Sequence, residues 1–253
     1  MLAHPKVIAV LPAYNAEKTL RQTLHDIPRD TVDDIVLVDD ASTDGTAALA
    51  RSLGLRTVVH PHNRGYGGNQ KTCYAEALKL GADVVVMVHP DHQYDPHAIP
   101  QLVAPIINGQ CDAVFGSRMI HRGAALSGGM PRWKYYPNIA LTVFENWCLG
   151  LRLTEYHSGF RAYTARVLNT VPLQLNSDGF VFDTEIIVQL VVHGFRIQEI
   201  PIPTRYFKDA SSVGFSGSVR YGLDIIRTMG RYGLTRLGIS RSPQFRRVVA
   251  QGV

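Results

Sequence analysis

The chain has 253 residues and a mass of 28.0 kDa, which allows one large α/β domain or two small ones. Hydrophobic residues make up 45% and charged residues 19% of the sequence, a composition that excludes a chain disordered throughout. No apolar run reaches the ~18 residues that a membrane-spanning helix needs, and the first residues lack the basic start and apolar core of a signal peptide. We therefore expect a folded, cytoplasmic protein.

The net charge of +5 is concentrated near the C-terminal end. Residues 201–253 contain nine Lys or Arg against two acids, so the preceding residues are slightly acidic overall. A basic tail on a near-neutral body favours an anionic partner, such as a membrane surface or a phosphorylated acceptor. Nucleic acid is disfavoured as a partner because no recognition module accompanies the charge.

Alternating apolar and polar segments predict repeated β-α units in the N-terminal part of the chain. Predicted strands cover residues 7–11, 35–38, 56–60 and 84–88, and predicted helices cover 17–25, 46–53 and 70–80. Continuous apolar strands joined by helices indicate a mostly parallel, Rossmann-like sheet buried on both faces. Ligands of such sheets bind beyond the carboxyl ends of the strands, where the polar loops lie.

The second half of the chain is less regular. We expect a strand at residues 112–116, a helix at 180–193 and a strand at 195–202. Residues 119–137 are rich in Gly, Pro and Arg and predict a mobile flap that serves as a lid. The Gly-rich stretch at residues 63–68 lacks the spacing of a dinucleotide site or a P-loop, so we interpret it mainly as a tight turn, with a phosphate cradle as the alternative.

The tail, residues 211–253, contains an amphipathic basic helix after a main domain of residues 1–210. Its apolar stripe consists of Val219, Leu223, Ile226, Leu234 and Leu237, with Arg220, Arg227 and Arg231 beside it. One interpretation is a helix packed on the domain or on a second subunit, as in a homodimer. The other is contact with a membrane surface.

Asp39 and Asp40 stand where an apolar strand stops and a turn-rich segment begins. Adjacent carboxylates repel each other, so such a pair favours a nearby ligand that carries hydrogen-bond donors, such as a nucleobase and a ribose. Ser42, Thr43 and Asp44 are more simply explained as helix-capping residues.

A second polar group follows the strand at residues 84–88 and includes His89, Asp91 and Gln93. Alternate residues of an extended segment point to the same side, so these three side chains can converge on one cation. A divalent metal there would neutralise a diphosphate. Oxygen ligands suit Mg²⁺, whereas an imidazole shifts the preference towards Mn²⁺.

Carboxylates and cations also gather in the second half, at residues 155–161 and 183–185. Glu155, Asp183 and Glu185 are candidate general bases for a hydroxyl acceptor, and Arg161 is a candidate contact for an anionic one. Each group can equally form a structural salt bridge.

Together these motifs resemble the family-2 glycosyltransferases of GT-A fold, especially the polyprenyl-phosphate sugar synthases of the dolichyl-phosphate mannose type. The resemblance spans Lys6 to about Phe207 and depends on the order of its motifs. The motifs are residues 11–17, 38–46, 63–65, 91–96, 116–118 and 158–161.

The resemblance implies roles for individual residues. Pro12, Ala13, Tyr14 and Glu17 would line the nucleoside pocket, and Asp39 would contact the base, next to Asp40, Asn63 and Gly65. Asp91 and Gln93 would hold a metal, Mn²⁺ or Mg²⁺, whereas Arg118, Arg132 and Lys134 would meet the acceptor phosphate or the sugar diphosphate. The family's acidic loop commonly begins with Asp, and this chain has His89 there.

The predicted function is inverting transfer of a hexose from a UDP- or GDP-sugar to a polyprenyl phosphate at the inner face of the membrane. A phosphate acceptor is already anionic and needs no strong base, whereas a hydroxyl acceptor needs a carboxylate. Two alternatives stay open: transfer to a soluble glycan or small-molecule hydroxyl, and a non-catalytic protein that binds nucleotide sugars.

Overall fold

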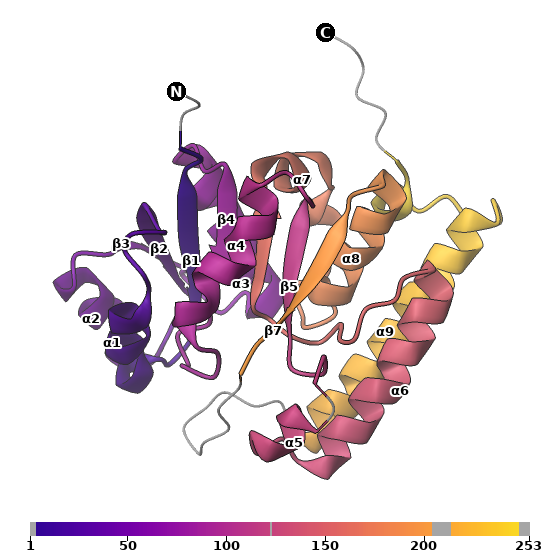
Figure 1. The fold of residues 1–253 in the computed structure, drawn as a ribbon, viewed down its shortest axis with the longest axis horizontal. Helices are drawn as coiled ribbons and strands as arrows, with labels where there is room; N and C mark the ends of the chain where they lie inside the picture. The colour runs from indigo at the N-terminus through magenta and orange to yellow at the C-terminus, as the bar shows by residue number, and fades with distance from the viewer. Residues whose placement is uncertain (1–3, 122, 204–213, 248–253) are drawn as a thin grey trace, which may run out of the picture.

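The structure is a computed structural model that describes residues 4–121, 123–203 and 214–247. A seven-stranded sheet in the order β3-β2-β1-β4-β6-β5-β7 forms its centre (Figure 1). The strands are β1 (Val7–Ala13), β2 (Asp34–Asp39), β3 (Arg56–Val59), β4 (Val84–Met87), β5 (Ala113–Ser117), β6 (Arg161–Thr164) and β7 (Ile197–Pro201). Only β6 is antiparallel to its neighbours, β4 and β5, so the predicted mostly parallel α/β sheet is confirmed.

Helices cover both faces of this sheet (Figure 1). The first face carries α1 (Glu17–Asp26), α2 (Thr46–Ser52) and α4 (Ile99–Ile107), whose apolar residues share one core with the sheet. The opposite face carries α3 (Gly65–Lys79), α6 (Arg132–Leu149), α7 (Ala165–Thr170), α8 (Phe182–His193) and α9 (Phe215–Arg236). A short α5 (Ala124–Ser127) precedes α6, and 3₁₀ turns lie at Pro96–Ala98, Leu173–Leu175 and Pro243–Phe245.

The first strands form where the apolar runs predicted them, because every residue of β4 and nearly every residue of β1 and β2 is buried between the two helical layers. Parallel pairing of β1 with β2 and β4 brings the three carboxyl ends to one edge. The loops that carry the predicted polar motifs therefore meet at that edge.

The Gly-rich segment is helical, which corrects the prediction of a tight turn. Helix α3 begins at Gly65, five residues before the predicted start at Gln70. Gly67 is needed because the helix approaches the backbone before α8, where the carbonyl of Asp178 accepts a hydrogen bond from the Gly67 N–H at 2.7 Å. A Cβ on Gly67 would lie 2.3 Å from the carbonyl oxygen of Ser177. Close approach, rather than turn geometry, selects glycine here.

Gly67→Ala should therefore lower the free energy of unfolding by about 1–3 kcal/mol, because the added methyl meets backbone atoms that cannot move aside cheaply. Gly230→Ala in α9 is the matched control, since a Cβ there meets nothing within 4 Å. The control should be neutral or stabilising by up to about 1 kcal/mol, as expected for alanine in a helix. Urea denaturation of both variants measures the difference, and equal stabilities would contradict the close-approach explanation.

The predicted flap is partly helical. Residues 124–127 form α5, and residues 132–137 belong to the first turns of α6, the helix that borders α9 in Figure 1. The predicted domain boundary after residue 210 and the end of the family resemblance at Phe207 lie outside the described residues. Beyond that boundary, α9 packs against α6 and α8, and its Ile225, Met229 and Tyr232 join the core. In the described ranges, no helix combines the length and apolar character needed to cross a membrane.

Candidate active site

A cavity of about 1130 Å³ opens at the carboxyl edge of the sheet and extends to α6 and α9. Its walls include many of the residues singled out from the sequence. They are Pro12, Ala13, Tyr14, Asp40, Asn63, Gly65, His89, Asp91, Gln93, Arg118, Lys134 and Asp183. The remaining candidates do not line the cavity: Glu17, Asp39, Arg132, Glu155, Arg161 and Glu185.

The loops after β1 and β2 bind each other through reciprocal hydrogen bonds. The Asn15 N–H donates to Ser42 Oγ at 2.8 Å, and the Thr43 N–H donates to Asn15 Oδ1 at 2.8 Å. Glu17 Oε2 accepts from the Gly45 N–H at 2.9 Å. Glu17 therefore holds the two loops together instead of lining the cavity. Asn15 takes a left-handed conformation, with φ 52°, and in this conformation it bonds to Ser42 and Thr43 of the other loop.

Asp39 and Asp40 have different surroundings. Asp40 Oδ1 and Oδ2 accept from the backbone N–H groups of Arg64 and Gly65 at 2.8 and 3.0 Å, so this carboxylate caps α3 while it lines the cavity. Asp39 is 1% exposed, and its Oδ2 accepts from the Ser42 N–H. Among the described residues its Oδ1 has no hydrogen-bond partner. A buried acceptor without a partner is costly, so this oxygen suits an N–H donor supplied by a ligand.

The loop after β4 is a turn, not the extended segment that we expected. His92 has a left-handed φ of 58°, and the Gln93 N–H donates to Asp91 Oδ1 at 3.1 Å. His92 turns away and binds Asp26 Oδ2 at 2.8 Å. His89, Asp91 and Gln93 nevertheless all line the cavity, although alternation along a strand is not the reason.

His89 is enclosed by aromatic and backbone neighbours. Its ring stacks on Tyr66 at 5.6 Å, and a Cβ on Gly159 would lie 2.3 Å from its Nε2. Burial lowers the pKa of His89, so the ring is neutral near pH 7. The Tyr66 O–H donates to Asp183 Oδ2 at 2.8 Å, so the Tyr66 oxygen is left to accept from His89 Nε2–H, 3.4 Å away. We infer that Nδ1 carries the lone pair.

The donor set of this loop fits a hard divalent cation. Burial raises the pKa of Asp91, because the protein groups around its carboxylate do not fully offset the hydration that the charge loses. In the described ranges no cluster of three or more His, Cys, Asp or Glu side chains is arranged to hold a metal. A cation beside Asp91 would therefore have few protein ligands and would need water and phosphate oxygens, which is the usual situation for Mg²⁺.

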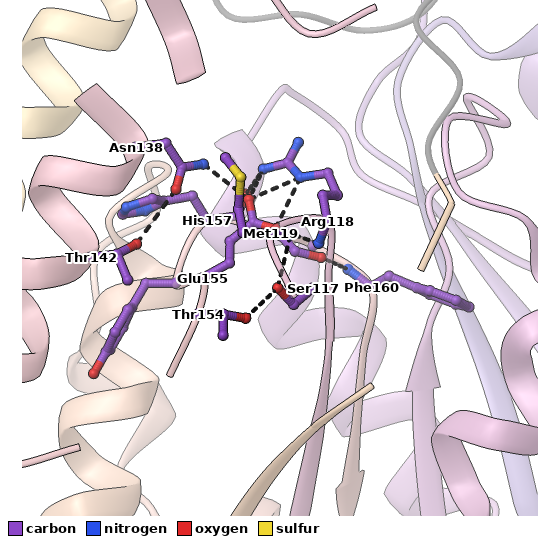
Figure 2. A network of polar contacts seen from close by, with 12 residues as sticks. Ser117, Arg118, Met119, Asn138, Thr142, Thr154, Glu155, His157 and Phe160 are labelled. Carbon is purple, nitrogen blue, oxygen red and sulfur yellow. Dashed lines mark hydrogen bonds and ion pairs between the residues drawn. The ribbon is translucent and has the colours of Figure 1, made fainter. Parts of the chain in front are cut away.

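Arg118 and Glu155 form a buried ion pair beside the cavity (Figure 2). Glu155 Oε2 accepts from the Arg118 N–H at 2.8 Å, and Asn138 Nδ2 donates to Oε1 at 2.9 Å. Burial pushes the pKa of Glu155 up, but the Arg118 guanidinium and these hydrogen bonds outweigh it, so the pKa lies below its usual range. Glu155 is ionised, both of its carboxylate oxygens accept hydrogen bonds, and it does not line the cavity. These contacts favour the structural salt bridge, which the sequence left open, over the predicted general base.

Arg161 and Glu185 are also structural residues. Arg161 is 2% exposed, and its guanidinium donates to the carbonyls of Ser158, Asp183 and Tyr156 at 2.7, 3.1 and 2.6 Å. These contacts favour the structural alternative over the predicted contact with an acceptor phosphate. Glu185 is 3% exposed and accepts from the Ser177 N–H. Of the three candidate bases only Asp183 reaches the cavity, and its carboxylate already accepts from Tyr66 and Gln70.

The far end of the cavity combines the Lys134 ammonium with apolar walls. Burial and the neighbouring Arg118 lower the pKa of Lys134, whose ammonium lies 5.0 Å from the ring centre of Trp133. Arg132 is exposed at the first position of α6, outside the cavity. The apolar walls consist of Met130, Trp133, Leu141, Val219, Leu223 and Ile226. Sequence patterns could not find this wall, because it is formed by two helices far apart in the chain.

A buried polar chain that we did not predict borders the same wall. Glu145 Oε2 lies 3.3 Å from His157 Nε2, and His157 Nδ1 lies 3.1 Å from the Tyr221 hydroxyl. Burial raises the pKa of Glu145 to about 8 and lowers that of His157 to about 4. Both groups are therefore neutral at pH 7, and among the described residues neither Glu145 Oε2 nor His157 Nε2 has a hydrogen-bond partner. His157 and Tyr221 line the cavity, so Glu145 orients part of its wall.

Glu145→Gln should flatten the pH dependence of stability. The pKa of Glu145 is raised in the folded state, so the folded protein holds a proton that the unfolded chain releases between pH 4.5 and about 8. The contribution of Glu145 to stability should consequently fall as pH rises through this window, so the stability of the wild type relative to the variant should decline, and the variant should be the more stable protein at pH 8. Thermal unfolding from pH 5 to pH 8 measures this, and parallel profiles would contradict it.

Comparison with known proteins agrees with the motif order. The sequence profile of glycosyl transferase family 2 matches residues 8–171. The chain belongs to glycosyl transferase family 2. An undecaprenyl-phosphate mannosyltransferase of Micrococcus luteus is 31% identical to this family-2 glycosyltransferase over 78% of the chain and 82% of that protein. A dolichyl-phosphate hexose transferase of Haloferax volcanii is 30% identical over 86% and 91%.

A solved structure gives the fold of this family-2 glycosyltransferase independently. Glucosyl-3-phosphoglycerate synthase from Mycobacterium tuberculosis superimposes with a TM-score of 0.72 at 24% identity, over 95% of this chain and 82% of that one. The predicted GT-A fold and the predicted family are thus confirmed.

Proposed function

We propose that the protein transfers a hexose from a UDP- or GDP-sugar to a polyprenyl phosphate, with inversion at the anomeric carbon. The observation that carries the proposal is the cavity itself, which is polar at the sheet edge and cationic and apolar at α6 and α9. A nucleoside diphosphate sugar matches the first part, and a phosphate on a hydrocarbon chain matches the second. The relatives named for undecaprenyl-phosphate and dolichyl-phosphate transfer support this acceptor class.

The donor end is assigned from the loops after β1, β2 and β4. The unpartnered Oδ1 of Asp39 suits the N–H of a base, and Asp39 pairs in the sheet with Ala13, a residue that lines the cavity. Asp91, with Gln93 and the Nδ1 of His89, would hold a divalent cation. That cation would neutralise charge on the diphosphate leaving group. Solved structures of the mycobacterial synthase with UDP and Mn²⁺ or Mg²⁺ support a metal at this fold's donor site.

The acceptor end is assigned from Lys134, Arg118 and the apolar wall. The Lys134 ammonium is the cation that enters the cavity without a carboxylate beside it in the contacts described, whereas Arg118 is held by Glu155. A phosphate monoester brings its own negative charge, so the nucleophile needs no proton acceptor. Lys134, Arg118 and the apolar wall have to position the acceptor phosphate opposite the leaving group and exclude water.

The test is transfer from UDP-glucose, UDP-N-acetylglucosamine and GDP-mannose to a short polyprenyl phosphate with Mn²⁺. Product with one donor, of inverted anomeric configuration by NMR, is the expected result. Lys134→Ala should raise the KM for the polyprenyl phosphate about tenfold or more while the KM for the donor stays near the wild-type value. Absence of product with every donor would overturn the lipid acceptor.

Transfer to a soluble acceptor is the second candidate, and the mycobacterial structure solved with phosphoglyceric acid is the observation that favours it. A hydroxyl acceptor would need Asp183 as its base, because this is the candidate carboxylate of α8 that lines the cavity. Product from phosphoglycerate or a monosaccharide in the same assay, together with loss of that product in Asp183→Asn, would select this function.

A further inference from the structure

Helices α6 and α9 each have one side that faces the protein core and a separate exposed stripe of apolar residues. In α9 the core side is formed by Ile225, Met229 and Tyr232, which are at most 8% exposed. The stripe predicted from the sequence lies about a third of a turn away and is exposed, with Val219, Leu223 and Ile226 at 50, 50 and 51%. The stripe therefore does not pack on this domain.

Helix α6 repeats this arrangement. Its side towards the core contains Asn138, Thr142, Glu145 and Leu149, all at most 8% exposed. The opposite side carries a second exposed apolar stripe, at the i, i+3, i+4 spacing of a helix face. This stripe consists of Trp133 (43%), Tyr136 (60%), Ile139 (39%), Val143 (63%) and Trp147 (80%).

The two stripes form one surface that includes the cavity lip. The helices lie side by side (Figure 1), and Trp133 of α6 and Val219, Leu223 and Ile226 of α9 belong both to the exposed stripes and to the cavity wall. At 1.5 Å per residue, α6 and α9 extend about 27 and 33 Å. Soluble monomers rarely leave so long an apolar surface uncovered.

The charges around this surface are almost all positive. The two helices contain six cations, Arg132, Lys134, Arg220, Arg227, Arg231 and Arg236, against Glu145 and Asp224. Glu145 is buried, Asp224 is bound by Arg227 at 3.0 Å, and Arg231 lies 3.7 Å from the buried Glu185 of α8, which leaves four cations without an acidic partner among the described contacts of these helices. Two copies of the surface would repel each other, whereas anionic lipid headgroups would be attracted. Tryptophan and tyrosine side chains are also suited to the boundary between headgroups and acyl chains.

We propose that the exposed stripes of α6 and α9 dock this protein on an anionic bilayer, with the cavity lip at the membrane. A lipid phosphate could then enter the cavity without leaving the bilayer. This last step rests on the proposed function, whereas the docking itself does not require it.

The chain's own fluorescence tests the proposal, because both of its tryptophans, Trp133 and Trp147, belong to the α6 stripe. Vesicles of phosphatidylcholine with phosphatidylglycerol, free of polyprenyl phosphate, should shift the emission to the blue and carry the protein in flotation. Brominated acyl chains should quench it. Added salt should weaken binding, and Arg220→Ala should weaken it about fivefold. No flotation with anionic vesicles at low salt would overturn the proposal.

Val143→Glu combined with Trp147→Glu should weaken vesicle binding about tenfold or more, since both residues are exposed and lie outside the cavity. Ile107→Glu, at a 40% exposed position at the end of α4, is the matched control and should bind like the wild type. Activity of the double variant on a detergent-dispersed short-chain acceptor should not change, which separates docking from transfer. If the double variant floats like the wild type, the surface does not dock on the membrane. If the wild type is a dimer and the double variant is a monomer that still floats, the surface belongs to a second copy of the chain instead.

Discussion

Asp91→Ala should lower the rate of sugar transfer by about 10³-fold or more, with the fold intact. Asp91 is the carboxylate of the loop after β4 that lines the cavity, whereas Asp95 of the same loop accepts from the His97 N–H and does not line it. The variant removes a buried carboxylate whose pKa is raised, so the free energy of unfolding should not fall much. Steady-state rates with Mn²⁺ and thermal unfolding of the same preparations measure both effects.

Asp91→Asn is the matched variant, because the amide oxygen can still accept from the Gln93 N–H. If the negative charge of Asp91 is needed to bind the metal, both Asp91→Ala and Asp91→Asn should lose transfer activity. Mn²⁺ with UDP should also raise the melting temperature of the wild type and of neither variant, since a ligand stabilises only the state that binds it. Near-normal transfer by Asp91→Asn would instead assign the residue to shaping the turn, and the metal proposal would fail.

Glu155→Gln should lower the free energy of unfolding by about 3 kcal/mol. The Arg118 side chain is 9% exposed and the Glu155 side chain 0%, so the substitution leaves a buried guanidinium without its counter-ion (Figure 2). Urea denaturation at pH 7 measures the loss. Glu76→Gln is the control. Glu76 pairs with the exposed Lys79 about one helical turn along the same helix, and this ion pair should contribute less than about 0.5 kcal/mol to the free energy of unfolding.

Two further measurements identify the ion pair as the cause. Arg118→Gln combined with Glu155→Gln should recover much of the lost stability, because no unpaired charge remains. The pKa of Glu155 is depressed, so its contribution is present above the usual value of 4.5 and is lost as pH falls through the folded-state pKa. The gap between wild type and Glu155→Gln should narrow in that acidic range. A constant gap would contradict an electrostatic origin.

Local patterns predicted the elements whose burial is uniform. The apolar runs of β1, β2 and β4 face helices on both sides, so composition alone identifies them. The start of α3 was missed because its glycines are required by close approach to the backbone of Ser177 and Asp178. These residues are distant in sequence, so no local pattern reveals the contact. Strand β6 was missed for a related reason, since Arg161 occupies its first position and was interpreted as a candidate contact for an anionic acceptor or a salt-bridge residue, not as part of a buried strand.

The same limit applies to the site. Motif order predicted the loops that line the cavity, including Pro12, Asp40 and Asp91, because parallel strands must deliver their carboxyl ends to one edge. Whether a charged side chain lies on the wall or behind it depends on its partners. Glu17 binds Gly45, and Glu155 binds Arg118, in each case across loops distant in sequence.

The sequence by itself determined the family, the sheet and the loops that meet at its edge, since these follow from hydrophobic periodicity and short motifs. Tertiary packing decided which of the acidic and basic candidates lie on the cavity wall, the chain of Glu145, His157 and Tyr221, and the apolar surface of α6 and α9. Such features depend on side chains brought together from distant segments, where burial and pairing, rather than residue type, fix charge and exposure.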